Sequence, residues 1–112
     1  MFITPQYAQS IVDEMKASIH RDVNIMDENG IIMASTNPAR KGTLHHGAAR
    51  IIQERLPSLT IWKDDPQSGV QRGINLPITI DGDLAGVIGV TGEPAEVSIF
   101  GDIIKRMTEI MV

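Results

Sequence analysis

The 112-residue sequence contains no cysteine, which excludes disulfides, thiolate metal sites and thiol catalysis. The absence of cysteine also fits a reducing compartment. No apolar run approaches the roughly 20 residues needed to span a bilayer, and the N-terminus lacks the basic and apolar regions of a signal peptide. We therefore expect a cytoplasmic domain that makes no contact with a membrane.

Positive charge is also scarce, because 10 Lys and Arg face 14 Asp and Glu and the formal net charge is −4. No stretch is densely basic, so we do not expect this chain to bind nucleic acid directly. With few aromatic residues, the core must consist mainly of Ile, Val, Leu and Met. The length suits one core and no linker or repeat divides the chain, so we predict a single domain over residues 1–112.

Three helices are indicated by caps and apolar spacing. Thr4 and Pro5 open a first helix that continues to about His20. Thr43 is the expected cap of a second helix, which ends near Leu56. A last helix opens at Pro94, and its expected inward residues are Val97, Phe100, Ile103, Ile104, Met107 and Met111. No stop signal follows this apolar stripe, so we expect the helix to continue into a downstream segment of a longer protein.

Alternating and apolar segments predict the strands. Residues 23–26 and 31–35 flank a turn and form an antiparallel hairpin. Further strands are expected near 60–63, 70–78 and 84–91, with Pro77 at an edge or bulge. Short links favour an α+β fold, an antiparallel sheet of about five strands with the helices packed on it. This order suits small sensor domains of the PAS or PDC type.

A first candidate site is the loop from Arg40 to Ala48, which enters the second helix. A helix N-terminus favours anions, and Arg40 and His45 can add charge-assisted hydrogen bonds to a carboxylate. The alternative interpretation is that Arg40 and Lys41 are solvated loop charges and Thr43 a plain cap.

A second candidate site is the strand from Gly73 to Ile78. Gly73 and Asn75 share one strand face, which can admit a small molecule beside the amide of Asn75. The alternative is that Gly73 marks a bulge and Asn75 faces water. Gly89 and Thr91 also share a strand face, and together they leave room for a ligand or a close-packed helix.

Other chemistry is poorly supported. The turn after residue 91 lacks the lysine of a phosphate loop, and glutamates occupy the following helix start, so we do not expect nucleotide binding. His45 and His46 are adjacent on the predicted helix and point about 100° apart, which does not suit one shared metal ion. No nucleophile elbow surrounds Ser35. We predict no metal, no cofactor and no catalytic residue.

Taken together, these segments resemble the N-terminal sugar-diacid recognition domain of the carbohydrate diacid regulators, which are bacterial transcriptional activators. The resemblance extends from about residue 3 to residue 111. It rests on the hairpin 24–30, the segment Arg40-x-Gly42-x-x-His45-x-Gly47-Ala48, the strand Gly73-x-Asn75-Leu76-Pro77-Ile78 and the turn 89–94.

The resemblance implies a PAS/PDC-like domain that binds a small hydroxy acid or sugar diacid, such as glycerate, glucarate or galactarate. It also implies a helix-turn-helix domain C-terminal to this chain, through which such a regulator binds DNA. Arg40 and His45 would meet a carboxylate, while Asn75 and Thr91 would meet hydroxyls or a second carboxylate. The residues expected at the ligand are Arg40, Gly42, His45, Gly47, Asn75, Leu76, Thr91 and, more weakly, Ser35.

The number of cations bears on the ligand. Arg72 falls on the opposite strand parity from Asn75, so a second cationic partner is not obvious, which favours a monocarboxylate such as glycerate. We expect ligand binding to favour one of two packings of the second helix, and the terminal helices to transmit this change. We also expect the terminal helices to form a homodimer. The alternatives are a dimerisation and relay domain without a ligand and, third, a small enzyme.

Overall fold

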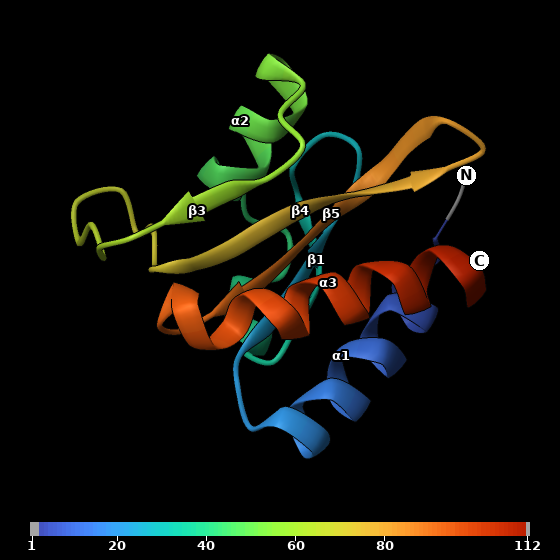
Figure 1. Ribbon diagram of the computed structural model, residues 1–112, viewed down its shortest axis with the longest axis horizontal. Coiled ribbons are helices and arrows are strands. Elements are labelled where there is room, and N and C mark those ends of the chain that lie inside the picture. The colour runs from blue at the N-terminus through green and yellow to red at the C-terminus, as the bar shows by residue number, and fades with distance from the viewer. Residues whose placement is uncertain (1–2, 112) are drawn as a thin grey trace.

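The structure is a computed structural model that describes residues 3–111 (Figure 1). It contains three α-helices, five strands and one short 3₁₀ turn. In chain order these are α1 (Pro5–Ile19), β1 (Val23–Met26), β2 (Ile32–Ser35), η1 (Pro38–Arg40), α2 (His46–Glu54), β3 (Leu59–Ile61), β4 (Gly73–Ile80), β5 (Asp83–Thr91) and α3 (Pro94–Met111). The predicted α+β class and five-stranded antiparallel sheet are confirmed.

The sheet has the strand order β2-β1-β5-β4-β3, with β5 at its centre. β1 pairs with both β2 and β5, so the first hairpin joins the last two strands across a long stretch of sequence. β3 pairs only with Gly73–Asn75 of β4. Pro77 therefore lies where β4 has a free edge, one residue before a bulge between Ile78 and Thr79, as predicted.

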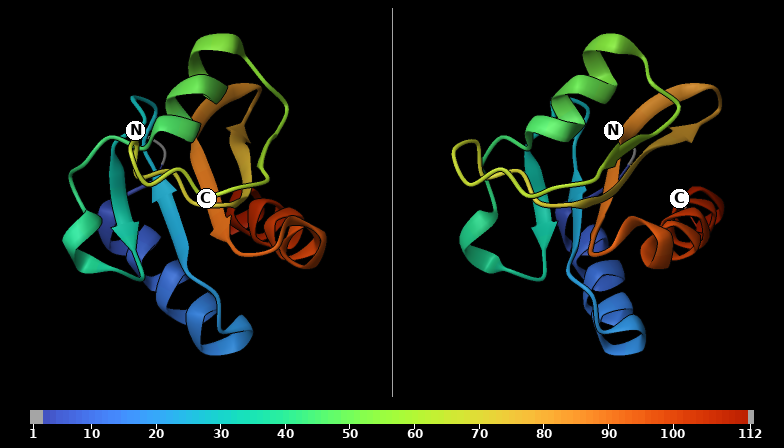
Figure 2. Two further views of the ribbon diagram at one scale, coloured as in Figure 1. Left: turned by 90° about the vertical axis from the view of Figure 1, so that its left-hand side faces the viewer. Right: turned by 60° about the vertical axis from the view of Figure 1, so that its left-hand side comes forward.

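The helices cover the two faces unequally (Figure 2). α1 and α3 lie together on one face, and the shorter α2 lies on the other. α1 begins as predicted, because the Thr4 hydroxyl accepts a hydrogen bond from the Tyr7 N–H at 3.1 Å, and it ends at His20 in the left-handed conformation (φ 57°).

The start of α2 and the orientation of α3 differ from the predictions. Thr43 does not cap α2, because its hydroxyl donates to the Arg40 carbonyl at 2.6 Å, and His45 is the cap instead. In α3, Val97 and Ile104 are buried as predicted, whereas Ile103, Met107 and Met111 are 43–57% exposed. The reason is Gly101, against which Ile74 and Leu76 of β4 pack so closely that a Cβ would lie 2.9 Å from the Ile74 side chain.

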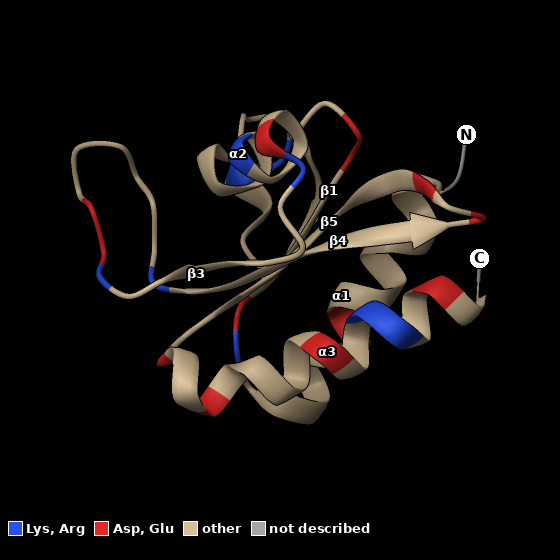
Figure 3. Cartoon of the chain, turned by 45° about the horizontal axis from the view of Figure 1, so that its top comes forward, with Lys and Arg blue, Asp and Glu red and all other residues tan. Residues whose placement is uncertain are grey.

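The strands are almost free of charge (Figure 3). Within the five strands only Asp83, at the start of β5, is ionisable as an acid or a base. Charged groups near the sheet must therefore come from the turns and helices around it. Across residues 3–111, the helices are too short or too polar for any one of them to cross a bilayer.

Candidate functional site

One row of residues crosses all five strands on the face that α2 covers. Ser35 pairs with Asn24, Asn24 with Gly89, Gly89 with Asn75, and Asn75 with Leu59. Directly opposed residues in antiparallel strands point to the same face. The register therefore places two asparagines on either side of a glycine, with no side chain between them.

The two sides of this row have different chemistry. On one side, Met26, Ile32 and Val87 pack against Ala48 and Ile51 of α2 and form a small core. On the other side, Thr91 pairs with Gly73 at the end of the sheet where η1 and the β3–β4 segment approach. The polar row therefore lies between the core under α2 and the exposed end of the sheet.

His45 brings the start of α2 over the polar row. Its Nδ1 accepts a hydrogen bond from the Ala48 N–H at 3.0 Å, so the neutral ring carries its proton on Nε2. Burial lowers the pKa of His45 to about 4, and the charge of Arg40 and the neighbouring His46 contribute further. Near neutral pH the ring is therefore uncharged, which corrects the expectation of a charge-assisted bond from this residue.

The two asparagines of the row are almost completely buried, with Asn24 2% and Asn75 4% exposed. Asn24 Oδ1 accepts a hydrogen bond from the Ser35 hydroxyl at 2.5 Å, and Asn75 Nδ2 donates to the Leu59 carbonyl at 3.4 Å. Within residues 3–111, Asn24 Nδ2 and Asn75 Oδ1 have no hydrogen-bond partner, yet no unsatisfied polar side-chain atom is sealed inside. One donor and one acceptor are thus available at a hollow that both residues line.

This hollow is small as it stands. Its volume is about 10 Å³, enough for about one water molecule. The side chains that line it include those of Asn24, Arg40, His45, Gln71, Asn75 and Thr91. An adjoining hollow of about 40 Å³ is also lined by Asn24, Arg40 and Gln71, and its far side is formed by Asp22, Ser35 and Thr36.

Charge at the two hollows is distributed unevenly. Arg40 contacts the neutral amide oxygen of Gln71 at 3.5 Å, and no carboxylate of the described chain lies within 4.0 Å of its guanidinium. Arg72 is instead paired with Glu93 at 3.5 Å. Asp22 lines the adjoining hollow, where a hydrogen bond from Thr36 lowers its pKa. An anion is therefore favoured beside Arg40 on the side away from Asp22.

Of the eight residues expected at a ligand, Arg40, His45, Asn75 and Thr91 line the hollow. Gly47 lies beside them, because a Cβ on it would be 3.1 Å from the His45 ring and 3.2 Å from the Asn75 amide. Ser35 does not line this hollow but contacts Asn24, which does. Its hydroxyl donates to Asn24 and accepts from the Asn37 N–H at 3.0 Å, so it orients Asn24.

Gly42 and Leu76 lie outside the hollow. A Cβ on Gly42 (φ 83°) would meet nothing within 4 Å, and the Gly42 N–H donates to the Ile32 carbonyl at 2.8 Å, so this glycine shapes the turn. Leu76 belongs to the core under α3, because it is adjacent to Asn75 in β4 and points to the opposite face.

Asn24 and Gln71 are polar lining residues that the sequence did not indicate. A signal for Asn24 existed, since it shares a strand face with the apolar Met26 and such a face is normally covered. Gln71 lies in the irregular segment between β3 and β4, where no periodicity places a side chain.

The described chain thus forms a five-stranded antiparallel sheet with helices on both faces and a polar hollow under α2. Solved structures share the fold. One is a methyl-accepting chemotaxis protein, residues 122 to 287, at TM-score 0.71 and 9% identity, covering 98% of this chain and 88% of that one. Another is the cofactor-binding GAF domain of the nutrient sensor CodY from Clostridium difficile, at TM-score 0.66 and 6% identity, covering 92% and 82%. The named domain type among them is GAF rather than PAS or PDC.

Residues 3–112 match the family described as "Putative sugar diacid recognition", and the chain belongs to this family, as predicted. It is 36% identical to the carbohydrate diacid regulator of Escherichia coli K12, over 94% of this chain and 28% of the regulator. It is 43% identical to the protein YsfB of Bacillus subtilis, over 100% of this chain and 31% of that protein. The chain thus spans less than a third of the length of these relatives.

Proposed function

We propose that this domain is an effector-binding sensor whose ligand is a small hydroxycarboxylic acid or sugar diacid, bound in the hollow between α2 and the sheet. The observation that carries the proposal is the pair of buried amides, Asn24 and Asn75, each with a free hydrogen-bonding atom at the hollow beside Arg40. Free amide groups can form hydrogen bonds with the hydroxyls of a ligand, and a guanidinium without a carboxylate partner can bind its acid group. His45 adds a neutral N–H donor at Nε2.

A larger groove of about 280 Å³ lies between α1 and α3, but it suits an acid poorly. Apolar side chains such as Ile11, Met15 and Met107 dominate its lining, and Glu14 is the charged residue there. A carboxylate placed in it would lose water without gaining a cation. The hollow under α2 is smaller but has the matching polar groups.

Within the proposed ligand class, a monocarboxylate such as glycerate fits the charge best. Arg40 is the cation available at the hollow, while Arg72 lines it but is held by Glu93. A dicarboxylate such as glucarate or galactarate would have to draw Arg72 away from Glu93 to pair its second acid group. The ligand then acts by population shift, because it binds more tightly to one packing of α2 than to the other.

The proposal places this domain in the cytoplasm, at the N-terminal side of a helix-turn-helix domain in a longer regulator. The sensor itself is not an enzyme and needs no cofactor or metal. The name of the Escherichia coli relative, a regulator, supports this role. The terminal helices α1 and α3 share one face of the sheet and would transmit the state of the ligand site to that domain.

The proposal is tested by a thermal-shift screen against glycerate, glucarate, galactarate and neutral sugars. A ligand at about 100 times its Kd should add roughly 2.7 kcal/mol to the free energy of unfolding. Arg40→Ala should abolish the shift without unfolding the domain. Lys41→Ala is the matched control, since this exposed neighbour lines neither hollow at the polar row. No shift with any acid at millimolar concentration would refute the proposal.

A second candidate function is dimerisation and signal relay without a ligand. The observation that favours it is the exposed apolar stripe on α3, where Ile99 is 60%, Ile103 48%, Met107 43% and Ile110 82% exposed. These positions recur at helical spacing, as in the seam between two helices. A homodimer through the terminal helices is compatible with ligand binding at the other face of the sheet.

Sedimentation equilibrium tests the dimer. Ile103→Lys should convert a dimer to a monomer, whereas Asp102→Lys, at the exposed neighbouring position, should leave it intact. A wild-type chain that stays monomeric at high micromolar concentration would contradict this function. Dimerisation combined with a complete failure to bind acids would favour the relay over the sensor.

A further inference from the structure

The side chain of Gln71 occupies the place where the proposed ligand would bring its acid group. Its Oε1 lies 3.5 Å from Arg40 Nη1 and 3.5 Å from Thr91 Oγ1. A guanidinium and a hydroxyl thus point their hydrogens at one acceptor oxygen. These are the donors that a carboxylate oxygen would meet at the same position.

Both contacts of the Gln71 oxygen are long. Strong hydrogen bonds from nitrogen to oxygen span about 2.7–3.2 Å, and a charged acceptor shortens and strengthens them further. The amide oxygen of Gln71 therefore satisfies Arg40 and Thr91 only weakly. A ligand carboxylate would pair with the guanidinium more favourably and can compete for this position.

The size of the hollow adds an independent reason for displacement. With about 10 Å³, it cannot accept a hydroxy acid as it stands. Gln71 lines both this hollow and the adjoining one of about 40 Å³, as do Arg40 and Asn24. Rotating the Gln71 side chain outward would join the two spaces along the polar row without moving a strand.

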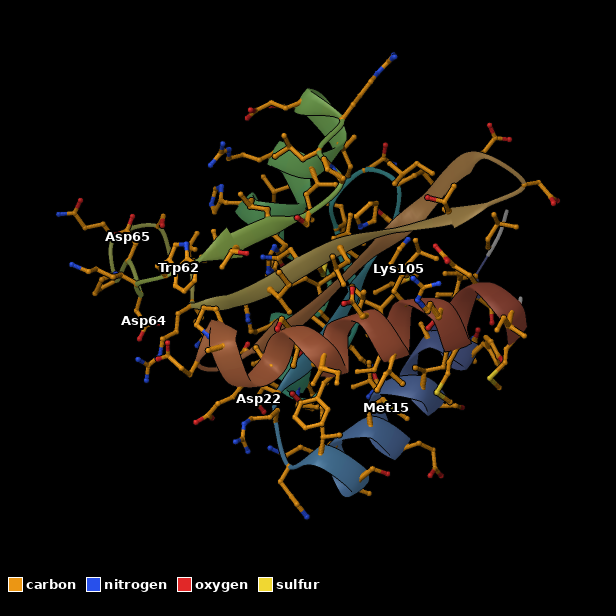
Figure 4. The ribbon with its side chains drawn as sticks, viewed as in Figure 1. Met15, Asp22, Trp62, Asp64, Asp65 and Lys105 are labelled. Atoms are coloured by element: carbon orange, nitrogen blue, oxygen red, sulfur yellow. The ribbon has the colours of Figure 1, made fainter. Side chains whose placement is uncertain are left out.

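The backbone beside Gln71 is fixed, so rotation of its side chain is sufficient. The Arg72 N–H donates to Asp64 at 2.7 Å, and the Arg72 carbonyl accepts from the Gly92 N–H at 3.0 Å. Gln71 itself is exposed and free to change rotamer. Trp62, the single tryptophan, and Asp64 lie at the start of the same projecting segment (Figure 4).

We propose that the Gln71 amide oxygen holds the position of the ligand's carboxylate between Arg40 and Thr91, and that the ligand displaces it on binding. This inference rests on the proposed function. Gln71 is then a specificity-determining residue. Its amide oxygen occupies the Arg40 guanidinium in the absence of ligand. Only a ligand with an anionic group beside its hydroxyls replaces this amide with a net gain in binding free energy.

The experiment compares Gln71→Ala, Gln71→Glu and the control Gln67→Glu, which adds the same charge to the same segment away from both hollows. Glycerate and glucarate binding is measured by titration calorimetry and by Trp62 fluorescence. Gln71→Ala should bind the acid at least as tightly as wild type, because the competitor is gone. Gln71→Glu should bind at least tenfold more weakly, because a tethered carboxylate occupies Arg40, and Gln67→Glu should bind as wild type.

The stability of the ligand-free domain measures the contact between residue 71 and Arg40 without any contribution from a ligand. Gln71→Glu should raise the Tm of the domain by a few degrees, and Arg40→Ala should remove this rise in the double variant. Wild-type binding together with a tenfold loss in Gln71→Ala would overturn the inference by making Gln71 a ligand contact. Unchanged affinity in Gln71→Glu would overturn it as well. A wild type that binds no acid would instead overturn the proposed function and, with it, the displacement.

Discussion

The two faces of the sheet differ in the size of their apolar cores and in their buried polar groups. Under α1 and α3, 14 buried apolar residues of the described chain form one core, whereas five form the core under α2. The first core contains buried helix residues such as Val12 and Ile104 against strand residues such as Ile25 and Ile88. The second gives way at the start of α2 to a row of buried amides around Gly89.

The α1/α3 face therefore contributes more to the stability of the domain than the α2 face does. Each fully buried Val, Leu or Ile side chain on the α1/α3 face contributes roughly 1.5–3 kcal/mol by leaving water. On the α2 face, Asn24 and Asn75 occupy equivalent interior positions and contribute far less, since each keeps one polar atom free. The proposed binding site accounts for this exchange.

The largest effect is expected from the α1/α3 face. Ile104→Ala should lower the free energy of unfolding by about 2–5 kcal/mol, because Ile104 is 1% exposed and its loss leaves a cavity in the core. Ile99→Ala is the matched control, since Ile99 lies on the same helix at 60% exposure and should change stability by about 0.5 kcal/mol or less. Urea unfolding measures both, and equal losses would contradict the described orientation of α3.

That orientation is also where prediction from the sequence was weakest. The apolar spacing of α3 contains two neighbouring stripes, and both were expected inside. Val97 and Ile104 are buried as predicted, whereas Ile103, Met107 and Met111 are exposed. The structure instead buries Gly101 and Thr108. Which stripe faces the sheet depends on the close approach of β4 to Gly101, and the apolar spacing of the helix does not indicate that contact.

Local signals predicted the fold well and half of the site. Gly73 and Asn75 were correctly placed on one strand face by the period of two. Leu76 was expected at the ligand because it belongs to the same sequence motif, although the period of two places it on the opposite face. Asn24 could not be joined to Asn75 from the sequence, because their proximity depends on β1 and β4 both pairing with β5. Such long-range registers have no local signature.

The α2 face should give the domain its main pH dependence between pH 4 and 6.5. His45 has a pKa of about 4 in the folded chain against an ordinary value of 6.5, so the unfolded chain binds more protons in this range. Stability is therefore complete above pH 6.5 and falls as the pH is lowered through about 4, by roughly 3 kcal/mol in all. The carboxyls of Asp22 and Asp65, whose pKa values are lowered from 3.8, lose their contribution only below this window.

His45→Asn should flatten this pH dependence, because asparagine also caps helices but does not titrate. His20→Asn, at the exposed end of α1, is the matched control and should keep the wild-type profile. Denaturant unfolding at pH 7, 6, 5 and 4.5 measures the slopes. A wild-type slope in His45→Asn would mean that another group couples folding to protons in this range.

A smaller effect on stability, but a large one on binding, is expected at Gly89. A Cβ there would lie 2.7 Å from Asn75 Oδ1, so Gly89→Ala must push the amide out of the row. We expect a loss of about 1–3 kcal/mol in stability and a strong loss of ligand affinity.

Gly47→Ala tests how much room the candidate site has for an added methyl group. Its Cβ would lie 3.1–3.2 Å from the His45 ring and the Asn75 amide, and both side chains can move slightly. Alanine is favoured over glycine in a helix by up to about 1 kcal/mol, so the net change in stability should be close to zero. Thermal unfolding and calorimetry measure both variants. A larger destabilisation by Gly47→Ala than by Gly89→Ala would contradict the close approach at the centre of the row.

A modest effect on stability is expected at the free edge of β4, where side chains of α3 bond to the unpaired backbone of the strand. Lys105 Nζ donates to the Pro77 carbonyl at 2.5 Å and to Glu109 at 2.5 Å, and Glu109 accepts from the Thr79 N–H at 2.8 Å. Lys105→Met keeps the apolar stem and removes the charged donor. We expect a loss of about 1 kcal/mol, since Lys105 is partly exposed and one carbonyl regains water.

This variant also tests whether the two faces act independently. Pro77 is two residues from Asn75 along β4, so a strand loosened at its edge can alter the position of the amide at the hollow. If the faces are independent, Lys105→Met lowers stability and leaves the affinity for the acid unchanged, as should the exposed control Arg106→Met. A fall in affinity in Lys105→Met alone would identify β4 as the element that carries the ligand's effect from the α2 face to α3.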